Sequence, residues 1–333
     1  MATLTHAAFR TLVWEYGGCD LYFSEMISAE ALLGGSPFEY AYRDARPDPG
    51  RLIYQLVGRT GDAIVEAASH LAAEPVHGID VNMGCSAPKI AKSGAGVTWM
   101  SYPREAAHLI SRLREVAPGK TVSAKIRLGI SEDSAYLARF ARELEAAGVS
   151  FITLHPRLKK QSYSRPSRWR SVRLLREAVS VPVFGSGDIT DFDVLRTRAE
   201  ETGVEGIMIG RAAAQRPWLF ADIRRADRAT GTAPLRHAGT EAVGDNTKWI
   251  DLRAVAARFH ELAESMLPEA FLPTRARRFY AYFLKNLAFG HRLAAQLQHM
   301  DGYEDIRAHV FGYFDEHPEY RRLETQEAVY AYS

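Results

Sequence analysis

One of the two cysteines in this 333-residue chain lies where a reactive thiol is expected. Cys85 follows an apolar, strand-like run and precedes a loop of small residues, proline and lysine, within GIDVNMGCSAPKIAKSGAG. A buried, inert cysteine is the common alternative, and it is our interpretation of Cys19, after the first predicted helix. For Cys85 the setting favours chemistry, because a thiol can donate a proton to a substrate carbon.

Polar or glycine-rich residues end nearly every apolar run in the first 212 residues. In chain order these ends are Glu25-Met26, Gln55, Asn82, Lys125 with Arg127, His155 with Arg157, Gly185-Ser186-Gly187-Asp188 and Gly210-Arg211. One polar strand end is weak evidence, since polar residues often cap strands, but so many together are hard to ascribe to chance. In a (β/α)₈ barrel the chemistry lies where strands end. We therefore expect these residues to line one site.

The last two of these strand ends predict a phosphate site. Gly185, Gly187 and Gly210 let backbone N–H groups approach an anion closely, Asp188 closes the first turn, and Arg211 offers a charge-assisted contact. Strand-to-helix turns need glycine in any case, so glycine alone does not decide the question. Phosphate sites in these barrels often use the loops after the last two strands.

A flavin mononucleotide fits the whole set of strand ends. Lys125 and His155 are costly to bury at a barrel mouth without an anionic partner. Gln55 and Asn82 would bond the pyrimidine edge of the flavin ring, with Lys125 near its electron-rich end. The loop that carries Cys85 would then lie above the ring.

Seven apolar runs alternate with amphipathic helical stretches in this part of the chain. They span residues 20–26, 51–58, 78–84, 121–129, 150–157, 181–188 and 206–212. The alternation predicts βαβ units and a parallel sheet. We predict an α/β fold, a TIM (β/α)₈ barrel whose first strand is missing or truncated, because the chain opens with a loop and a helix that begins near Thr5 or His6. The alternatives are a barrel that stays open where the first strand is missing, and a barrel in which another segment of the chain takes the place of that strand.

The pattern changes after Arg211. We predict a barrel domain over residues 1–225, a linker or surface loop over 226–247, and an all-helical domain over 248–333.

Two basic segments stand out against a net charge of only +2. Residues 157–176 carry eight Lys or Arg and no acid, and residues 270–300 carry five more, again without an acid. Solvated helix faces are the simplest explanation. The alternative is a positive electrostatic field on one side of the protein that attracts a polyanion. It favours as contacts Lys159, Lys160, Arg277, Arg278 and Lys285.

Composition narrows the class of protein. No apolar run approaches the roughly 20 residues that a membrane span needs, and the N-terminus lacks the pattern of an export signal. Two cysteines make no disulfide framework, and no Cys/His cluster has zinc spacing. We expect a cytoplasmic protein without a metal or a membrane partner, and a monomer.

At these residues the sequence resembles the tRNA-dihydrouridine synthases. The family's Asn-x-Gly-Cys-Pro segment appears as NMGCSAP, its Lys-x-Arg-x-Gly strand as KIRLG, and its His-x-Arg loop, followed by Gln and Tyr, as HPRLKKQSY. A GNGDI-like turn appears as GSGDI, and GRAAAQRPW and the basic RRFYAYFLKNL follow in the family's order. Three departures are the absent Ala-Pro-Met strand, the Ser-Ala inserted before Pro88, and Ser186 in place of Asn.

The resemblance implies an FMN enzyme that reduces specific uridines in tRNA to 5,6-dihydrouridine, with NADPH as reductant. Hydride would pass from the reduced flavin to C6 of uracil, and Cys85 would donate the proton to C5. Gln55, Asn82, Lys125, His155, Gly187 and Gly210-Arg211 match flavin-contact positions of the family. Arg157 would lie where the substrate enters, and the helical domain would bind tRNA after the base is flipped out.

Two other functions remain open at this point. One is another FMN barrel acting on a free pyrimidine, like a dihydroorotate dehydrogenase, which would not need the basic helical tail. The other is a tRNA-binding protein that has lost its flavin with its first strand.

Overall fold

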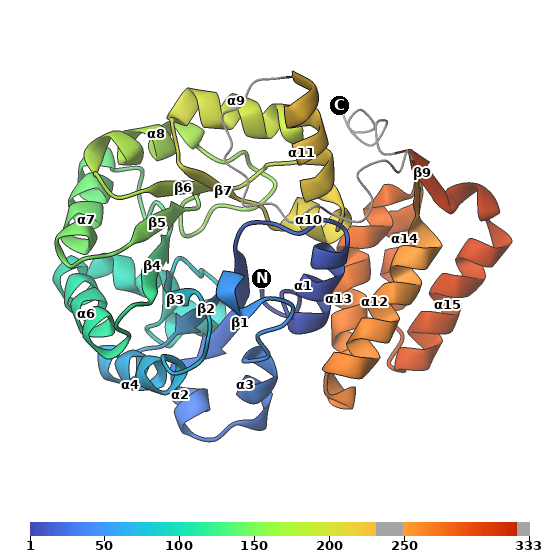
Figure 1. Cartoon of the computed structure of the whole chain (residues 1–333), viewed down its shortest axis with the longest axis horizontal. Helices are drawn as coiled ribbons and strands as arrows, with labels where there is room; N and C mark the ends of the chain where they lie inside the picture. Colours follow the sequence, from blue (N-terminus) through green and yellow to red (C-terminus); the bar gives the residue numbers. More distant parts are fainter. Residues whose placement is uncertain (231–248, 325–333) are drawn as a thin grey trace. The chain divides into compact units, whose positions relative to one another are not determined.

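The computed structural model describes residues 1–230 and 249–324, which belong to two compact units (Figure 1). Phe23–Ile209 form what we call the strand unit, and Met1–Tyr22 together with Gly210–Ser333 form the helical unit. The predicted boundary at residue 225 does not coincide with this division. The reason is packing: the N-terminal helix lies against α12 (Leu252–Met266), and α10 (Arg211–Gln215) lies against α13 (Leu272–Phe283).

Seven strands cross the sheet of the strand unit in sequence order, and the pairs from β2 to β7 are parallel. They are β1 Tyr22–Ser28, β2 Leu52–Val57, β3 Gly78–Met83, β4 Thr121–Ile126, β5 Phe151–Leu154, β6 Val183–Ser186 and β7 Gly206–Met208. The sheet curls into a half-barrel with its helices on the outer side (Figure 1). The predicted α/β barrel fold is confirmed. Six of the seven predicted runs contain one strand each, and β1 overlaps the run 20–26 but extends two residues beyond it.

Helices connect these strands and shield the outer face of the sheet. They are α2 Ala29–Leu33, α3 Pro37–Tyr42, α4 Gly61–Leu71, α5 Pro88–Lys92, α6 Pro103–Val116, α7 Ser134–Ala146, α8 Trp169–Ala178 and α9 Phe192–Thr202, with 3₁₀ turns at Pro49–Arg51 and Gly96–Ser101. Side chains cap several of their first turns. Thr60, Asp133 and Asp191 accept backbone N–H groups of α4, α7 and α9. From α6 to α9 each helix packs against the next, which fixes the spacing of the strands behind them.

Every residue of β2 and β3 is buried, as is usual for a parallel sheet covered on both faces. These two strands nevertheless include Gln55, Asp80 and Asn82. A buried polar side chain costs free energy unless it is hydrogen-bonded, so these three positions need partners inside the barrel.

The helical unit contains α1 Ala7–Glu15, α10, α11 Leu219–Thr230, α12, α13, α14 Gly290–Leu297 and α15 Tyr303–Glu316, with 3₁₀ turns at Glu269–Phe271, Leu284–Asn286 and Pro318–Tyr320. The imidazole of His6 caps α1 by accepting the N–H of Phe9, so the predicted start of this helix is confirmed. The expectation of an all-helical tail is wrong at two places. The short strands β8 Trp249–Asp251 and β9 Arg322–Glu324 pair antiparallel, and three residues are too few to show a strand period.

An aromatic stack and one histidine form the core of the helical unit. Phe279 stacks on Phe259 at 4.0 Å and on Phe283 at 4.9 Å between ring centroids. His260 is buried between the hydroxyl groups of Tyr303, at 2.6 Å, and Tyr280, at 2.8 Å. Burial lowers the pKa of His260 to about 3, so this imidazole is neutral and structural at physiological pH.

The predicted linker falls mostly outside the described residues. Helix α11 continues to Thr230, so residues 226–230 are helical, and residues 231–247 lie beyond what the structure describes. Among the described helices, none is long and apolar enough to cross a membrane.

Candidate active site

The register of the strand unit places the polar strand residues in two adjacent layers. Gln55 of β2 pairs with Asp80 of β3, which pairs with Ser123 of β4. Two residues further toward the carboxyl ends of β3 and β4, Asn82 pairs with Lys125. Neighbours in register point to the same face of a sheet, so the strand period of two brings all five side chains together.

Four of these side chains and the Cys85 loop form one hydrogen-bond chain. The hydroxyl of Ser123 donates to Asp80 Oδ1 at 2.7 Å, and Gln55 Nε2 donates to Asp80 Oδ2 at 2.8 Å. Asn82 Nδ2 donates to Gln55 Oε1 at 2.8 Å, and Asn82 Oδ1 accepts the backbone N–H of Cys85 at 2.8 Å. A continuous buried network therefore runs from the floor of the half-barrel to the proposed catalytic cysteine.

Cys85 is half-buried, and backbone contacts on both sides hold its loop. Its carbonyl oxygen accepts the N–H of Val97 at 3.0 Å. Gly96 has a φ of +59°, and a Cβ there would lie 2.5 Å from the carbonyl oxygen of Cys85, so only glycine fits at this approach. The loop is thus packed against the start of the 3₁₀ turn that follows it.

Two polar groups at the mouth lack protein partners among the described residues. Lys125 makes no hydrogen bond or ion pair there, and burial lowers the pKa of its ammonium to about 8 although Asp80 opposes this effect. Thr153, which pairs with Lys125 in register, has a buried hydroxyl oxygen with no partner in the same part of the chain. Unsatisfied polar groups of this kind are expected where a polar ligand binds.

Burial also perturbs the carboxyl group beneath this mouth. The pKa of Asp80 rises to about 6 because burial disfavours its charge, while hydrogen bonds from Ser123 and Gln55 and the charge of Lys125 oppose the rise. Asp80 is therefore largely ionised at neutral pH and acts as a hydrogen-bond acceptor.

Arg157 lies at the centre of a second cluster and is completely buried. Its guanidinium donates to both carboxylate oxygens of Asp188, at 2.7 and 2.6 Å, and to the carbonyl oxygens of Tyr163 and Arg165. Arg157 Nη1 also lies 2.9 Å from His155 Nε2. A guanidinium group can only donate, so Nε2 is the acceptor and the proton of a neutral His155 is on Nδ1. These bonds show that Arg157 orders the loop of residues 158–168.

The glycines of the predicted phosphate site have unequal surroundings. A Cβ at Gly185 would lie 2.3 Å from the ring of Trp169, so packing alone explains that glycine. Gly187 has a φ of +123°, and a Cβ there would lie 3.0 Å from the His155 ring. Gly210 and Arg211 belong to the helical unit. The predicted phosphate site therefore includes residues of both units and remains a prediction.

The basic segment 157–176 is less positive than its composition indicates. Four of its eight cations are ion-paired: Arg157 with Asp188, Arg168 with Glu132, Arg173 with Glu177 and Arg176 with Glu205. Lys159 is half-buried and Lys160 exposed, and neither makes an ion pair among the described residues. The segment keeps a positive surface, but a smaller one than predicted.

In the helical unit the structure brings Arg277, Arg278 and Lys285 to one hollow of about 440 Å³ on α13 and α14. The hollow is lined by Thr3, Thr274, Arg277, Arg278, Ala281, Lys285, Gly290, His291, Ala294, Ala295 and Gln298, none of which is acidic. Arg278 and Lys285 are exposed, whereas Arg277 donates to the carbonyl oxygen of Met300. Arg275, in contrast, is buried with its guanidinium 4.2 Å from the Phe271 ring centroid.

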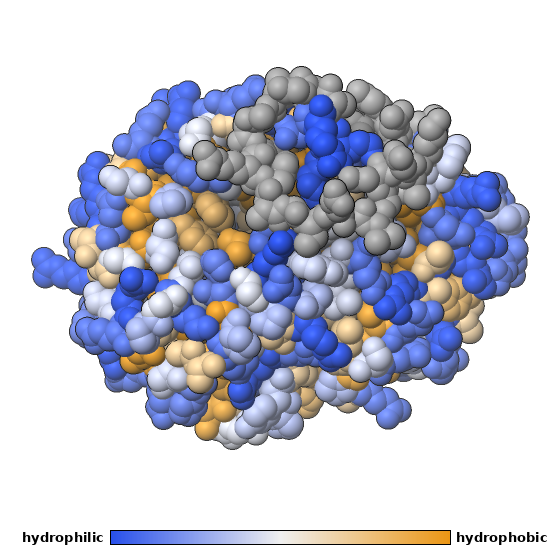
Figure 2. Space-filling model, viewed as in Figure 1, coloured by the Kyte–Doolittle hydropathy of each residue, from blue (hydrophilic) through white to orange (hydrophobic). Residues whose placement is uncertain are grey.

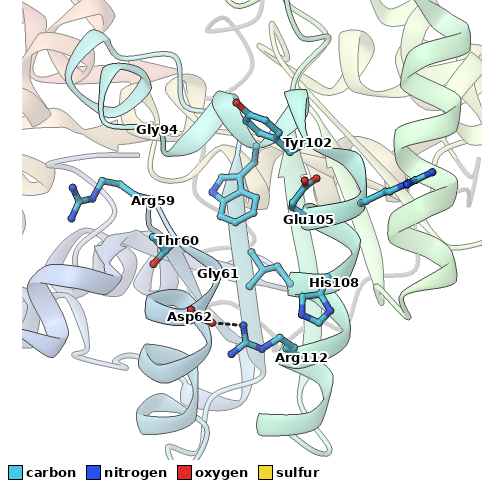
Figure 3. Close-up of a pocket in the computed structure, with 12 residues that line it drawn as sticks. Arg59, Thr60, Gly61, Asp62, Gly94, Tyr102, Glu105, His108 and Arg112 are labelled. Carbon is cyan, nitrogen blue, oxygen red and sulfur yellow. Dashed lines mark hydrogen bonds and ion pairs between the residues drawn. The ribbon is translucent and has the colours of Figure 1, made fainter.

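A different hollow of about 500 Å³ lies between α4 and α6 of the strand unit (Figure 3). The ion pair of Asp62 with Arg112 spans it, and Tyr102 stands at its upper rim in that view. None of the predicted site residues lines this hollow, so its size does not mark the site. Figure 2 shows a largely hydrophilic surface on one face of the molecule, with scattered apolar residues.

Sequence reasoning missed Asp80 and Ser123. Each lies two residues before a predicted site residue on the same strand, Asp80 before Asn82 and Ser123 before Lys125. The strand period of two was the signal that identifies them, because it places each pair on one face.

Comparison with known proteins identifies relatives of this chain. A family model described as dihydrouridine synthase (Dus) matches residues 1–266. A probable tRNA-dihydrouridine synthase of Aquifex aeolicus is 35% identical over 228 residues, 67% of this chain and 71% of that protein. One of Rhodobacter capsulatus is 37% identical over 227 residues, 68% of this chain and 69% of that protein. A solved structure of 2-naphthoyl-CoA reductase with 2-naphthoyl-CoA matches with a TM-score of 0.50 at 12% identity, over 68% of this chain and 47% of that chain, and shows the fold alone.

The curled parallel sheet, with polar residues gathered at the carboxyl ends of its strands, places the protein among the barrel enzymes. The chain belongs to the dihydrouridine synthase family, and the resemblance found in the sequence is thereby confirmed. It is therefore an oxidoreductase.

Proposed function

We propose that this protein reduces specific uridines of tRNA to 5,6-dihydrouridine, with FMN as cofactor and NADPH as reductant. The observation that carries the proposal is the hydrogen-bond chain that fixes Cys85 beside Lys125, an ammonium group with no partner among the described residues. The relatives named as tRNA-dihydrouridine synthases support the choice of substrate.

The residues at the mouth fit a flavin. Beyond the bonds already made, the amide of Gln55 keeps one donor and one acceptor site, and the amide of Asn82 keeps one donor, because its oxygen accepts the N–H groups of Gly84 and Cys85. These sites suit the alternating carbonyl and N–H groups of a pyrimidine edge. Lys125 supplies a positive charge beside them, and Thr153 an unused hydroxyl. When bound, the flavin supplies the hydride that is added to C6 of uracil.

The chain's own residues carry out the proton transfer. The thiol of Cys85 donates its proton to C5 of uracil as the C5–C6 double bond becomes a single bond, and water returns a proton to the thiolate afterwards. Asn82 holds the backbone of Cys85, so the thiol keeps one position during the transfer. Lys125 offsets negative charge at the mouth.

Within the strand unit, Gly187 would contact the cofactor phosphate, with His155 donating from Nδ1, and the phosphate contacts of Gly210 and Arg211 stay predictions from the sequence. The tautomer of His155 supports this role, because Arg157 occupies the other ring nitrogen. Asp188 contributes indirectly by holding Arg157, and Gly185 by making room for Trp169.

The uridine has to leave the stacked RNA to reach a barrel mouth. Lys159 and Lys160 of the loop that Arg157 orders, and the hollow with Arg277, Arg278 and Lys285, would hold RNA phosphates. Arg157 therefore serves the substrate through this loop and not by direct contact.

The test uses the full chain supplied with FMN, NADPH and tRNA transcribed without modifications. Dihydrouridine in digested tRNA, detected by mass spectrometry as a gain of two hydrogens, is the expected product. Visible absorption of the protein reports whether FMN is bound. Turnover of free uracil or orotate without turnover of tRNA would instead show an enzyme of free pyrimidines, and a colourless protein that binds tRNA would show a binding protein.

Removing two cations from the hollow should weaken tRNA binding. We expect Arg278→Ala with Lys285→Ala to raise the KM for tRNA about tenfold near 0.1 M salt, because each lost phosphate contact removes counterion release. The dependence of log affinity on log salt should become shallower by about 1 to 2. Steady-state kinetics at several salt concentrations measure both quantities.

Arg307→Ala with Arg322→Ala is the matched control, since it removes two exposed or partly exposed cations of the same unit that do not line the hollow. Oxidation of NADPH without tRNA should be unchanged in both double variants. Equal losses of tRNA affinity in the two would show that only net charge matters and that the hollow is no binding site.

A further inference from the structure

We propose that Lys89 and Lys92 hold the RNA phosphates on either side of the uridine that is reduced. The inference rests on the proposed function and deepens it, because it concerns how the same mouth receives its substrate. The sequence pattern did not single out these residues, since two lysines in a loop do not form a basic segment.

The two lysines belong to α5, which lies on the same side of the strand unit as the mouth. This helix begins at Pro88, three residues after Cys85, in the connection that follows the carboxyl end of β3. Val97 donates its N–H to the carbonyl oxygen of Cys85 at 3.0 Å. The hydroxyl of Thr98 donates to the carbonyl oxygen of Ala91 on α5 at 3.1 Å. These bonds join α5 and the Cys85 loop to one turn, so a group bound by α5 is held near the thiol.

The side chains of Lys89 and Lys92 share one face of α5. They are three residues apart on a helix, which places about 5 to 6 Å between their Cβ atoms. Both side chains are exposed, and neither makes a hydrogen bond or an ion pair with any residue that the structure describes. Two cations at this spacing can each contact a different phosphate of one RNA strand.

The surroundings of these lysines do not neutralise their charge. Residues 81–104 contain no aspartate or glutamate, and the 3₁₀ turn Gly96–Ser101, against which α5 packs, has no charged residue. Half of the cations in the segment 157–176, by contrast, are ion-paired. Lys89 and Lys92 therefore present a positive surface to a polyanion although their segment holds few charges.

A uridine that reaches the mouth brings its own phosphates with it. A flipped nucleotide stays covalently joined to its neighbours through the phosphates on its 5′ and 3′ sides. With the base at Cys85, these phosphates lie at the edge of the mouth. Lys89 is four residues from Cys85, at most about 14 Å along an extended chain, so its long side chain can reach that edge. Contacts to both phosphates would position the base without reading its identity.

The first experiment removes the two charges together. We expect Lys89→Gln with Lys92→Gln to raise the KM for tRNA about tenfold near 0.1 M salt, because two phosphate contacts are lost. The slope of log affinity against log salt should become shallower by about 1 to 1.5, the value for two contacts to a single strand. Lys89→Arg with Lys92→Arg keeps both charges and should stay within about twofold of the parent, since arginine also binds phosphate.

Arg114→Gln with Arg142→Gln is the matched control, because it removes the same charge from the opposite end of the strand unit. Both side chains are exposed. Arg114 donates to the carbonyl oxygen of Lys120, just before β4, and Arg142 to that of Ala178, the last residue of α8. These positions lie at the amino ends of the strands, so this variant should stay within about twofold of the parent in its KM for tRNA.

The second experiment asks whether the lysines contact the flanking phosphates themselves. The target uridine is identified first, from the dihydrouridine that the parent forms. tRNA is then assembled by ligation with an uncharged methylphosphonate linkage on the 5′ and 3′ sides of that uridine. This tRNA should have a KM about tenfold higher with the parent. With Lys89→Gln and Lys92→Gln the same linkages should change the KM less than about twofold, because the contacts that they remove are already absent.

Three outcomes would overturn the inference. The first is an equal KM for tRNA in the parent and in Lys89→Gln with Lys92→Gln, and the second is a set of losses that add independently in the second experiment. The third is a larger rise in the KM for NADPH than in that for tRNA, because the lysines would then hold a phosphate of the dinucleotide. A parent that forms no dihydrouridine in tRNA would refute the proposed function itself, and this result is seen before any substitution is made.

Discussion

Cys85→Ala is expected to lower the rate of uridine reduction in tRNA by a factor of about 10² to 10⁴, the usual contribution of a positioned proton donor. Alanine removes the thiol and nothing else from the site. The bond from the backbone N–H of residue 85 to Asn82 does not depend on the side chain, and neither does the bond from Val97 to the Cys85 carbonyl. The variant should therefore retain FMN, visible in its absorption spectrum, and oxidise NADPH at the parent rate without tRNA.

The measurement is dihydrouridine formed in a single turnover, quantified by mass spectrometry. Cys19→Ala is the control, because Cys19 lies in the helical unit and its thiol donates to the carbonyl oxygen of Leu21 at 3.2 Å. That variant should react like the parent. Full turnover by Cys85→Ala would remove the proton-donor role from the proposed mechanism, whereas loss of FMN together with turnover would show that Cys85 acts on the fold of the loop.

The strand framework could be predicted from the sequence because each strand is a short apolar run bounded by helical patterns. The register that pairs Gln55 with Asp80 and Asn82 with Lys125 could not, since it depends on how neighbouring strands are offset. The sequence therefore predicted residues at the ends of strands, but not Asp80, which lies one layer deeper and connects them.

Charge was harder to predict than strand position. The segment 157–176 contains no acid, yet its arginines form ion pairs with Glu132, Asp188 and Glu205. These acids lie outside the segment, far from their partners in sequence or on other elements. Composition counts the charges within a segment, whereas the surface field depends on ion pairs formed across the fold. Arg157, which is predicted to lie where the substrate enters, likewise has its charge paired across the fold, with its guanidinium buried against Asp188.

Asp188→Ala is expected to lower the free energy of unfolding by about 2 to 3 kcal/mol, because it leaves the guanidinium of Arg157 buried without a counter-charge. The estimate lies at the lower end for a buried pair, since the Asp188 side chain is 34% exposed. Asp188 also has a φ of +56°, which asparagine tolerates better than alanine does. Asp188→Asn should therefore cost less than Asp188→Ala.

The loss should depend on pH in a defined direction. Burial alone would raise the pKa of Asp188, but hydrogen bonds from Arg157 and Ser167 outweigh this and lower it to about 2. A carboxyl group whose folded pKa lies below its ordinary value of 3.8 stabilises the protein above that pH and loses the effect as the pH falls toward 2. The parent and Asp188→Ala should thus differ most above about pH 4 and converge in acid.

Denaturant unfolding at several pH values measures this difference, and Asp191→Ala is the control. Asp191 caps α9 by accepting the N–H of Val194 at 2.9 Å, so its loss should cost about 1 kcal/mol without touching Arg157. Because Arg157 also holds the carbonyl groups of Tyr163 and Arg165, Asp188→Ala should loosen the loop that carries Lys159 and Lys160 and raise the KM for tRNA, whereas Asp191→Ala should not. Equal stability of Asp188→Ala and the parent at pH 7 would mean that Arg157 does not depend on this ion pair.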